Sequence, residues 1–156
     1  MKVCWEETKV IDGEFVQGGM KTITLPFGQI TVRALIVRRS DRAVLGALHR
    51  PDGCYALPGG SITDGDSPQD ALLRELAEEG ITLIGGSENW RECLAVDYFR
   101  GYNQLSLWYL FLVDDVAVTQ TDELLQMEWI TSDQDPWYPN QRVKIQNWIK
   151  EYLEVS

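Results

Sequence analysis

Three glutamates, Glu75, Glu78 and Glu79, fall on one face of a short predicted helix. Successive residues of an α-helix are about 100° apart around its axis, so the three carboxylates share one arc of the surface. Two such charges about 4 Å apart repel by roughly 4 kcal/mol at an effective dielectric constant of about 20. Hard carboxylate oxygens are what Mg²⁺ or Mn²⁺ takes as ligands. The face therefore predicts a divalent-cation site, and a solvated acidic surface is the alternative.

The helix that carries these residues has clear start and stop signals. Ser67 can cap its N-terminus, Pro68 suits the first helical position, and Asp70 follows the cap by three residues, as in a capping box. Gly80 is the natural stop. A leucine stripe beside the acidic arc is predicted to dock on the core, and it consists of Leu72, Leu73 and Leu76.

The stretch around this helix is similar to the sequence signature of a known family. Gly60 is followed after five residues by Asp66 and, after seven more, by Arg-Glu-Leu-Ala-Glu-Glu at residues 74–79. This spacing resembles the Nudix box, G-x5-E-x7-R-E-U-x-E-E-x-G-U with U apolar, over residues 60–82. The lead-in Leu57-Pro58-Gly59 is also typical of that family. The resemblance implies the Nudix fold, an α/β/α sandwich with a mixed β-sheet.

The box departs from the family pattern at two positions. Asp66 stands where the family has Glu, which is a mild change. Gly80 follows Glu79 directly, one residue early, so that either a residue is deleted or Ile81 replaces the family's glycine. The second departure shortens the end of the helix and can shift Glu79 relative to a metal.

The resemblance implies a role for each box residue. Glu75, Glu78 and Glu79 look like metal ligands, and the Gly60 carbonyl oxygen is often a further ligand in this family. One of the glutamates, or a more distant one, activates a water molecule. Arg74 looks like a structural residue that pairs with a box glutamate and holds its rotamer. The alternative for Arg74 is a surface pair with Glu78, worth about 0.2–0.5 kcal/mol.

A more distant acid and a second glycine complete the expected catalytic set. Glu123 precedes the pair Glu128-Trp129 by five residues, which resembles a Nudix loop whose glutamate joins the metal cluster or acts as base. An exposed loop acid is the alternative. Gly59, like Gly60, lets the backbone approach a phosphate closely, and a simple tight turn is the other interpretation.

Aromatic residues and one amide are the candidates for substrate binding. Tyr55, Trp137 and Tyr138 carry rings that can stack on a base. Residues 135–140 loosely resemble a segment of MutT-like members that ends in a base-reading asparagine, which here would be Asn140. The alternative for Asn140 is the N-cap of the final helix.

Apolar and alternating runs predict the remaining elements. Strands are expected at residues 30–38, 43–48, 81–84, 91–99, 105–113 and 126–130. The final helix is expected to begin at Asn140 and to bury Ile145, Trp148, Ile149 and Tyr152. Trp108, inside an apolar strand, is expected in the core. Strands interrupted by two helices suggest a mixed sheet between helical layers.

At 156 residues the chain is expected to form a single Nudix domain over residues 1–156. Residues 1–28 form an N-terminal extension in which a hairpin of 15–16 with 21–25 is expected. Three cysteines, odd in number and in no metal spacing, suggest a reducing compartment. The sequence shows no signal peptide and no apolar run long enough to span a bilayer. A cytoplasmic location is therefore expected.

The net charge of −10 argues against binding to nucleic acid or an anionic membrane. The resemblance implies a Mg²⁺-dependent hydrolase, with Mn²⁺ as a substitute, that cleaves a phosphoanhydride bond of a nucleoside diphosphate linked to another group. A nucleoside triphosphate is the first expectation and a nucleoside diphosphate sugar the alternative. A non-catalytic nucleotide-sensing module is the alternative from another class. The expected partner is a small-molecule nucleotide, and both a monomer and a homodimer remain open.

Overall fold

The centre of the molecule is a six-stranded β-sheet with the order β12-β6-β5-β10-β9, in which β7 also pairs with β5. The computed structural model describes residues 2–5, 9–11, 14–16, 21–24, 29–51, 53–63, 65–86, 90, 92–99, 103–122 and 126–153. The strands of the sheet are β5 (Gln29–Arg38), β6 (Val44–Leu48), β7 (Gly59–Ser61), β9 (Ala95–Phe99), β10 (Gln104–Val113) and β12 (Gln126–Ile130). β5 and β10 run parallel and the other pairs antiparallel. The sheet is therefore mixed, as predicted.

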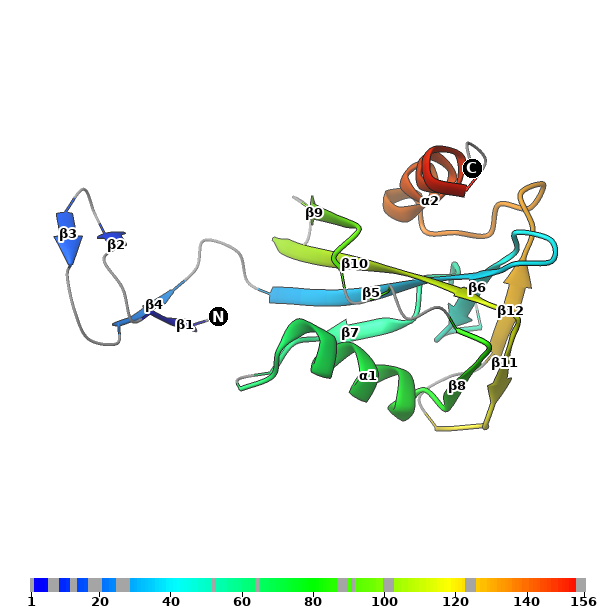
Figure 1. Cartoon of the computed structure of the whole chain (residues 1–156), viewed down its shortest axis with the longest axis horizontal. Coiled ribbons are helices and arrows are strands. Elements are labelled where there is room, and N and C mark those ends of the chain that lie inside the picture. Colours follow the sequence, from blue (N-terminus) through cyan, green and yellow to red (C-terminus); the bar gives the residue numbers. More distant parts are fainter. Residues whose placement is uncertain are drawn as a thin grey trace.

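Two helices cover this sheet from opposite sides (Figure 1). α1 (Pro68–Glu78) packs on one face and α2 (Pro139–Leu153) on the other. The arrangement confirms the α/β class and the sandwich of helix, sheet and helix. Within the described part of the chain, no helix is long and apolar enough to cross a membrane.

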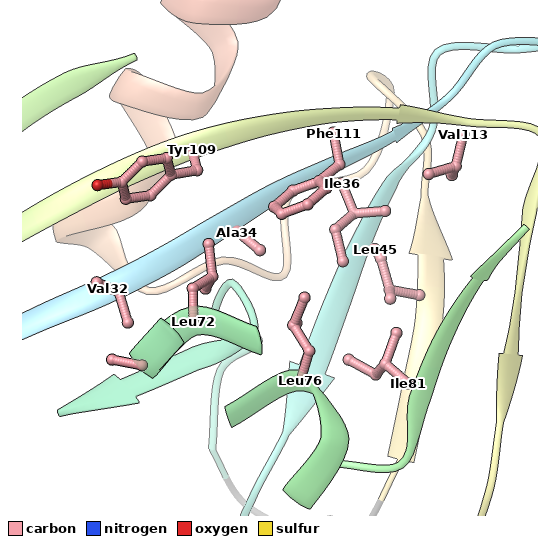
Figure 2. Packing of buried hydrophobic residues seen from close by; sticks show 11 residues of the cluster. Val32, Ala34, Ile36, Leu45, Leu72, Leu76, Ile81, Tyr109, Phe111 and Val113 are labelled. Atoms are coloured by element: carbon pink, nitrogen blue, oxygen red, sulfur yellow. The ribbon is translucent and has the colours of Figure 1, made fainter. Parts of the chain in front are cut away.

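The sheet face that α1 covers holds one hydrophobic core (Figure 2). Leu72 and Leu76 point from α1 toward the sheet and are 0% and 3% exposed. They pack with apolar side chains of several strands: Val32, Ala34 and Ile36 of β5, Leu45 of β6, Ile81 of β8 (Ile81–Ile84), and Tyr109 and Phe111 of β10. Full burial of one leucine stabilises a fold by about 1.5–3 kcal/mol. Leu73, predicted as the third docking residue, is 43% exposed because it lies at the rim of the stripe.

The opposite face of the sheet packs against α2. Trp108 of β10 is fully buried, as predicted, and its ring meets that of Trp148 edge-on, with 4.3 Å between centroids. Ile145 is 1% exposed, and Ile149 packs on the same cluster. The stripe predicted for the final helix is confirmed at these positions, and the side chain of Tyr152 lies outside the described part of the structure.

Both ends of α1 agree with the sequence signals. The Ser67 hydroxyl accepts a hydrogen bond from the Asp70 N–H at 3.1 Å, and Pro68 is the first helical residue. At the other end, Gly80 has a φ of +74°, and its carbonyl oxygen accepts a hydrogen bond from the Thr119 N–H at 2.8 Å. This glycine turns the chain directly from α1 into β8.

α2 begins at Pro139, one residue earlier than predicted. The Tyr138 carbonyl oxygen accepts hydrogen bonds from the backbone N–H groups of Gln141 and Arg142 at 2.9 and 3.1 Å, so Tyr138 occupies the N-cap position. The prediction of Asn140 as N-cap is therefore wrong. A proline is compatible with the first turn because its missing N–H would have no partner within the helix.

Three strand pairings differ from the sequence-based prediction. β11 (Asp115–Val118), which was not predicted, pairs with β8 in a separate two-stranded sheet. In the N-terminal extension, β2 (Lys9–Ile11) pairs with β3 (Glu14–Val16), and β1 (Lys2–Trp5) pairs with β4 (Lys21–Thr24). The expected pairing of 15–16 with 21–25 is wrong. The sequence between β2 and β3 is Asp-Gly, a dipeptide typical of two-residue hairpins, which favours the observed pairing.

Gly80→Ala should destabilise the fold more than Gly65→Ala. The two glycines have φ angles of +74° and +91°, and a left-handed alanine costs about 1–2 kcal/mol. A Cβ on Gly80 would also overlap the Thr119 carbonyl oxygen, whereas a Cβ on Gly65 would meet nothing within 4 Å. Urea unfolding of both variants measures the difference. Equal losses would show that Thr119 moves aside at no cost.

Candidate active site

The three glutamates of α1 are buried to different degrees. The side chain of Glu78 is 45% exposed and that of Glu75 is 14% exposed. Glu79 is only 2% exposed, and it is the C-cap residue because α1 ends at Glu78. The acidic face therefore extends from solvent at Glu78 to the interior at Glu79.

Arg74 joins these acids into one network. Its Nη1 donates to Glu75 at 3.0 Å and to Glu78 at 3.3 Å, and its Nη2 donates to Asp66 at 3.2 Å and to the Ser61 carbonyl oxygen at 3.1 Å. Burial acts to lower the pKa of Arg74, but the carboxylates of Glu78, Asp66 and Glu75 outweigh it and raise that pKa. The guanidinium thus orients two glutamates and ties α1 to the loop before it.

Gly60 lies directly against the Glu75 carboxylate. A Cβ at position 60 would overlap that carboxylate, so only a glycine lets the β7 backbone and Glu75 come this close. β7 is held in place by its pairing with β5, where Gly60 lies opposite Val32. The Ala34 N–H also donates to the Pro58 carbonyl oxygen at 2.8 Å. The Gly60 peptide and the Glu75 oxygens are therefore fixed as neighbours.

Arg33 is a charged residue of this region that sequence reasoning missed. It lies opposite Gly59 across the β5–β7 pair, and its Nη1 donates to the Leu57 carbonyl oxygen at 3.2 Å. Burial lowers the pKa of the Arg33 guanidinium, and the negative charges of Glu79 and Glu75 act in the opposite direction. From its position on β5, Arg33 therefore offsets part of the negative charge of Glu79 and Glu75. An arginine within an otherwise apolar run was the available signal in the sequence.

A pocket of about 540 Å³ lies beside Arg33 and the start of β7. Its polar lining consists of Arg33, His49, Arg50, Gln104, Tyr138 and Gln141. Gly59 also lines it, directly before the glycine that touches Glu75. Two arginines in the lining of a chain with a net charge of −10 make this pocket suitable for an anionic ligand.

Of the three aromatic residues predicted to bind substrate, Tyr138 lines this pocket, and Tyr55 and Trp137 do not belong to its lining. Trp137 is 6% exposed and packs in the core on the α2 side. Tyr55 forms a β-bridge with Trp137, and its carbonyl oxygen accepts a hydrogen bond from the Tyr138 N–H at 3.0 Å. Burial and a hydrogen bond to Glu128 raise the pKa of Tyr55 to about 12. The backbone of Tyr55 and the buried side chain of Trp137 thus hold the segment that carries Tyr138.

The side chains of two other predicted site residues lie outside what the structure describes. Glu123 belongs to the segment 123–125, which is not described, and only the backbone of Asn140 is described, within α2. The base role of Glu123 and the base-reading role of Asn140 therefore stay predictions.

The strand order, the acidic end of α1 and the segment Pro58-Gly59-Gly60 that leads into β7, called the glycine loop below, can be compared with known proteins. A family model, that of the NUDIX domain, matches residues 28–151. The chain belongs to the Nudix family. Family membership makes it a hydrolase of the pyrophosphatase type.

Individual relatives of this Nudix domain are distant. An RNA pyrophosphohydrolase from Halorhodospira halophila (strain DSM 244 / SL1) is 26% identical over 127 residues, which cover 70% of this chain and 68% of that protein. The crystal structure of a Nudix hydrolase family member from Chromobacterium violaceum superposes with a TM-score of 0.64 at 20% identity, covering 85% of this chain and 84% of the other.

A third relative was crystallised with ligands. The bifunctional NMN adenylyltransferase/ADP ribose pyrophosphatase from Francisella tularensis, complexed with AMP and a manganese ion, has a TM-score of 0.62 at 22% identity. The match covers 81% of this chain and 43% of that longer one. At these identities the solved structures establish the Nudix fold.

Nudix hydrolases generally use a divalent metal, and the donors here fit a hard cation. Glu75 and Glu78 lie in the last turn of α1 and Glu79 is its C-cap, and Gly60 lies against the Glu75 carboxylate. Among the described residues, no three acidic, histidine or cysteine side chains form a ready-made metal site. Arg74 donates to one oxygen, Oε1, of both Glu75 and Glu78.

The structure also explains the departure of this Nudix box at Gly80. Gly80 adopts the left-handed conformation of a helix-ending glycine. Ile81 is 6% exposed and is the first residue of β8. The geometry therefore favours the deletion of one residue over the replacement of the family's glycine by Ile81. Glu79 becomes the C-cap of α1 as a result.

Asp66→Asn should weaken the Nudix fold at neutral pH and have little effect in strong acid. Hydrogen bonds from Thr63 and Arg74 hold the pKa of Asp66 below its ordinary value of about 3.9. Its contribution to stability is therefore present above that value and is lost as the pH falls through the lowered native pKa. Unfolding free energies of wild type and variant should differ at pH 7 and converge in acid.

Asp66→Glu is the matched control for this prediction, because it keeps a carboxylate and restores the residue of the family pattern. It should retain the pH dependence of the wild type. A loss of stability in Asp66→Asn that is the same at every pH would contradict the prediction.

Proposed function

We propose that this Nudix hydrolase cleaves a phosphoanhydride bond of a free nucleotide, in the first place a nucleoside triphosphate. The proposal rests on two residues, Arg33 and Gly59, that line the pocket and also lie close to the acidic side chains of α1. Arg33 lines the pocket and also lies in the electrostatic field of Glu79 and Glu75. Gly59 lines the pocket directly before Gly60, which touches Glu75. A nucleoside bound in the pocket would therefore extend its phosphates toward the acids.

Each residue of the box has a definite part in this proposal. Glu75, Glu78, Glu79 and the Gly60 carbonyl oxygen would hold the divalent cation, Mg²⁺ or Mn²⁺. Such a cation, when bound, neutralises phosphate oxygens and lowers the pKa of an attacking water molecule. One of the three glutamates, or Glu123, accepts the proton of that water as general base. Direct attack of water on phosphorus needs no covalent enzyme intermediate.

The two arginines have supporting parts. Arg74 orients Glu75 and Glu78 through hydrogen bonds of 3.0 and 3.3 Å. Arg33 supplies positive charge next to Glu79 from the sheet side, whether or not a cation is bound. Its guanidinium also lines the pocket, where it can bind a phosphate oxygen of the substrate.

A second candidate substrate is an RNA with a 5′-triphosphate end, because the relative from Halorhodospira halophila is an RNA pyrophosphohydrolase. The bond cleaved would be of the same kind, and the difference is whether the protein also binds the nucleotides that follow. The net charge of −10 disfavours a long polyanion, so we rank the free nucleotide first.

A panel of substrates tests the proposal. Nucleoside triphosphates, a nucleoside diphosphate sugar and a 5′-triphosphorylated RNA oligonucleotide are incubated with and without Mg²⁺, and released phosphate and pyrophosphate are measured. Triphosphates should be cleaved with the highest kcat/KM, and only with the cation present. A higher kcat/KM for the RNA or for the nucleoside diphosphate sugar would show that this compound, and not a free triphosphate, is the preferred substrate. Nucleotide binding without turnover would identify a sensing module.

We also propose a cytoplasmic location. Cys54 and Cys93 are free and exposed, and exposed thiols persist in reducing compartments.

Glu79→Gln should reduce turnover by about 10²–10⁴-fold, the range for loss of a group that handles a proton in the transition state. It should also weaken Mn²⁺ binding, measured by calorimetry, because the amide is a poorer ligand for a hard cation. Glu151→Gln, an exposed position on α2, makes the same change of charge and should keep the rate of the wild type. Wild-type rate and metal affinity in Glu79→Gln would exclude Glu79 from the site.

A further inference from the structure

A second pocket, of about 190 Å³, lies between α2, the start of β6 and the end of β12. None of the described residues that line it also lines the larger pocket beside Arg33, so it is separate from the candidate active site. Its apolar wall consists of Val44, Ile130, Trp137, Ile145 and Ile149.

The volume of this second pocket suits one small molecule. An apolar cavity of about 150 Å³ holds one benzene molecule, whereas pockets for drug-sized ligands measure about 300–1,000 Å³. A nucleotide is therefore too large for the second pocket. One ring, or a short apolar chain, with a single polar group fits it.

The polar side of the second pocket is held in place by hydrogen bonds within one turn. Thr131 and Gln134 both line the pocket. The Thr131 N–H donates to Gln134 Oε1 at 3.1 Å, and the Gln134 N–H donates to the Thr131 carbonyl oxygen at 3.0 Å. The turn is therefore formed before a ligand arrives, which lowers the entropic cost of binding one.

The charge of this lining is opposite to that of the whole chain. The sequence has 24 acidic and 14 basic residues. Among the described residues that line the second pocket, Arg42 and Lys150 are basic and none is acidic. Arg42 belongs to the turn between β5 and β6, and Lys150 to the last turn of α2. Two cations from separate elements thus favour an anionic group in the ligand.

Arg42 occupies a backbone position that does not favour arginine. Its φ is +61°, in the left-handed region, where glycine, asparagine or aspartate is usual. The Arg42 N–H donates to the Arg38 carbonyl oxygen at 2.9 Å, so the turn fixes this conformation. A role for the guanidinium at the pocket explains a residue that the turn alone would not select.

We propose that the second pocket binds a small organic anion, namely a carboxylate that carries one aromatic ring or a short apolar chain. The apolar part of the ligand packs on Trp137 and the isoleucines of the wall, and the carboxylate pairs with Arg42 and Lys150. The inference goes beyond the proposed function and does not depend on which substrate is hydrolysed.

Benzoate is the probe for the test, and benzyl alcohol is its uncharged counterpart of similar size. Each is titrated into the full chain with isotope-labelled isoleucine methyl groups, and the methyl signals are followed by NMR. Benzoate should shift the signals of Ile130, Ile145 and Ile149 and leave that of Ile81, in the core on the α1 side, unchanged. Its Kd should be about fivefold lower than that of benzyl alcohol, the effect of an ion pair near the surface.

Three variants test the role of charge. Arg42→Asn and Lys150→Gln each remove one positive charge from the lining, and both should reduce the preference for benzoate while the binding of benzyl alcohol stays unchanged. Arg42→Asn should also keep or raise the Tm, because asparagine tolerates the left-handed backbone. Arg39→Gln is the matched control, since it removes the same charge three residues from Arg42 at a residue outside the described lining, and it should keep the preference.

The inference is wrong if benzoate leaves the signals of Ile130, Ile145 and Ile149 in place, or if benzyl alcohol binds as tightly as benzoate. It is also wrong if Arg39→Gln lowers the preference as much as Lys150→Gln does, because net charge alone would then explain the preference. The measurement involves no hydrolysis, so failure of the proposed function would leave its outcome unaffected.

Discussion

Charge compensation at the acidic end of α1 is the constraint on which the site depends. Two buried leucines dock this helix on the sheet, and the docking carries Glu75 and Glu79 toward the interior. A carboxylate buried without a counter-charge is strongly destabilising. Arg74 from the helix and Arg33 from the sheet supply that charge. The two arginines allow one short helix to combine a hydrophobic face with an acidic one.

The site also joins the two faces of the sheet. Leu57 packs in the core on the α2 side, and three residues later Gly60 lies against Glu75 of α1. The glycine loop therefore crosses from one face to the other, and Gly59 makes the crossing possible, since a Cβ there would overlap the Val32 carbonyl oxygen. These few residues therefore connect the acidic side chains on the α1 side with the pocket lining at the start of α2.

The sequence predicted best what is decided locally. Ser67 and Gly80 act within their own turns, so the ends of α1 could be read directly. Where two local signals compete the prediction fails, as when Pro139 rather than Asn140 begins α2. Contacts between residues far apart in the chain produce no periodic pattern in the sequence. The hydrogen bond from the Leu57 N–H to Gln141, for example, joins residues 84 positions apart. The acidic face was therefore predictable from spacing, and the pocket was not.

The parallel pairing of β5 with β10 has a consequence for the way this protein is made. Partners such as Thr31 and Ser106 are 75 residues apart, so β5 leaves the ribosome long before its central neighbour has been synthesised. Until then a strand that is buried along most of its length in the folded protein has only nearby segments to cover it. Such long-range pairing makes folding slow and exposes the incomplete chain to aggregation. The whole Nudix box can be translated before the sheet that positions it exists.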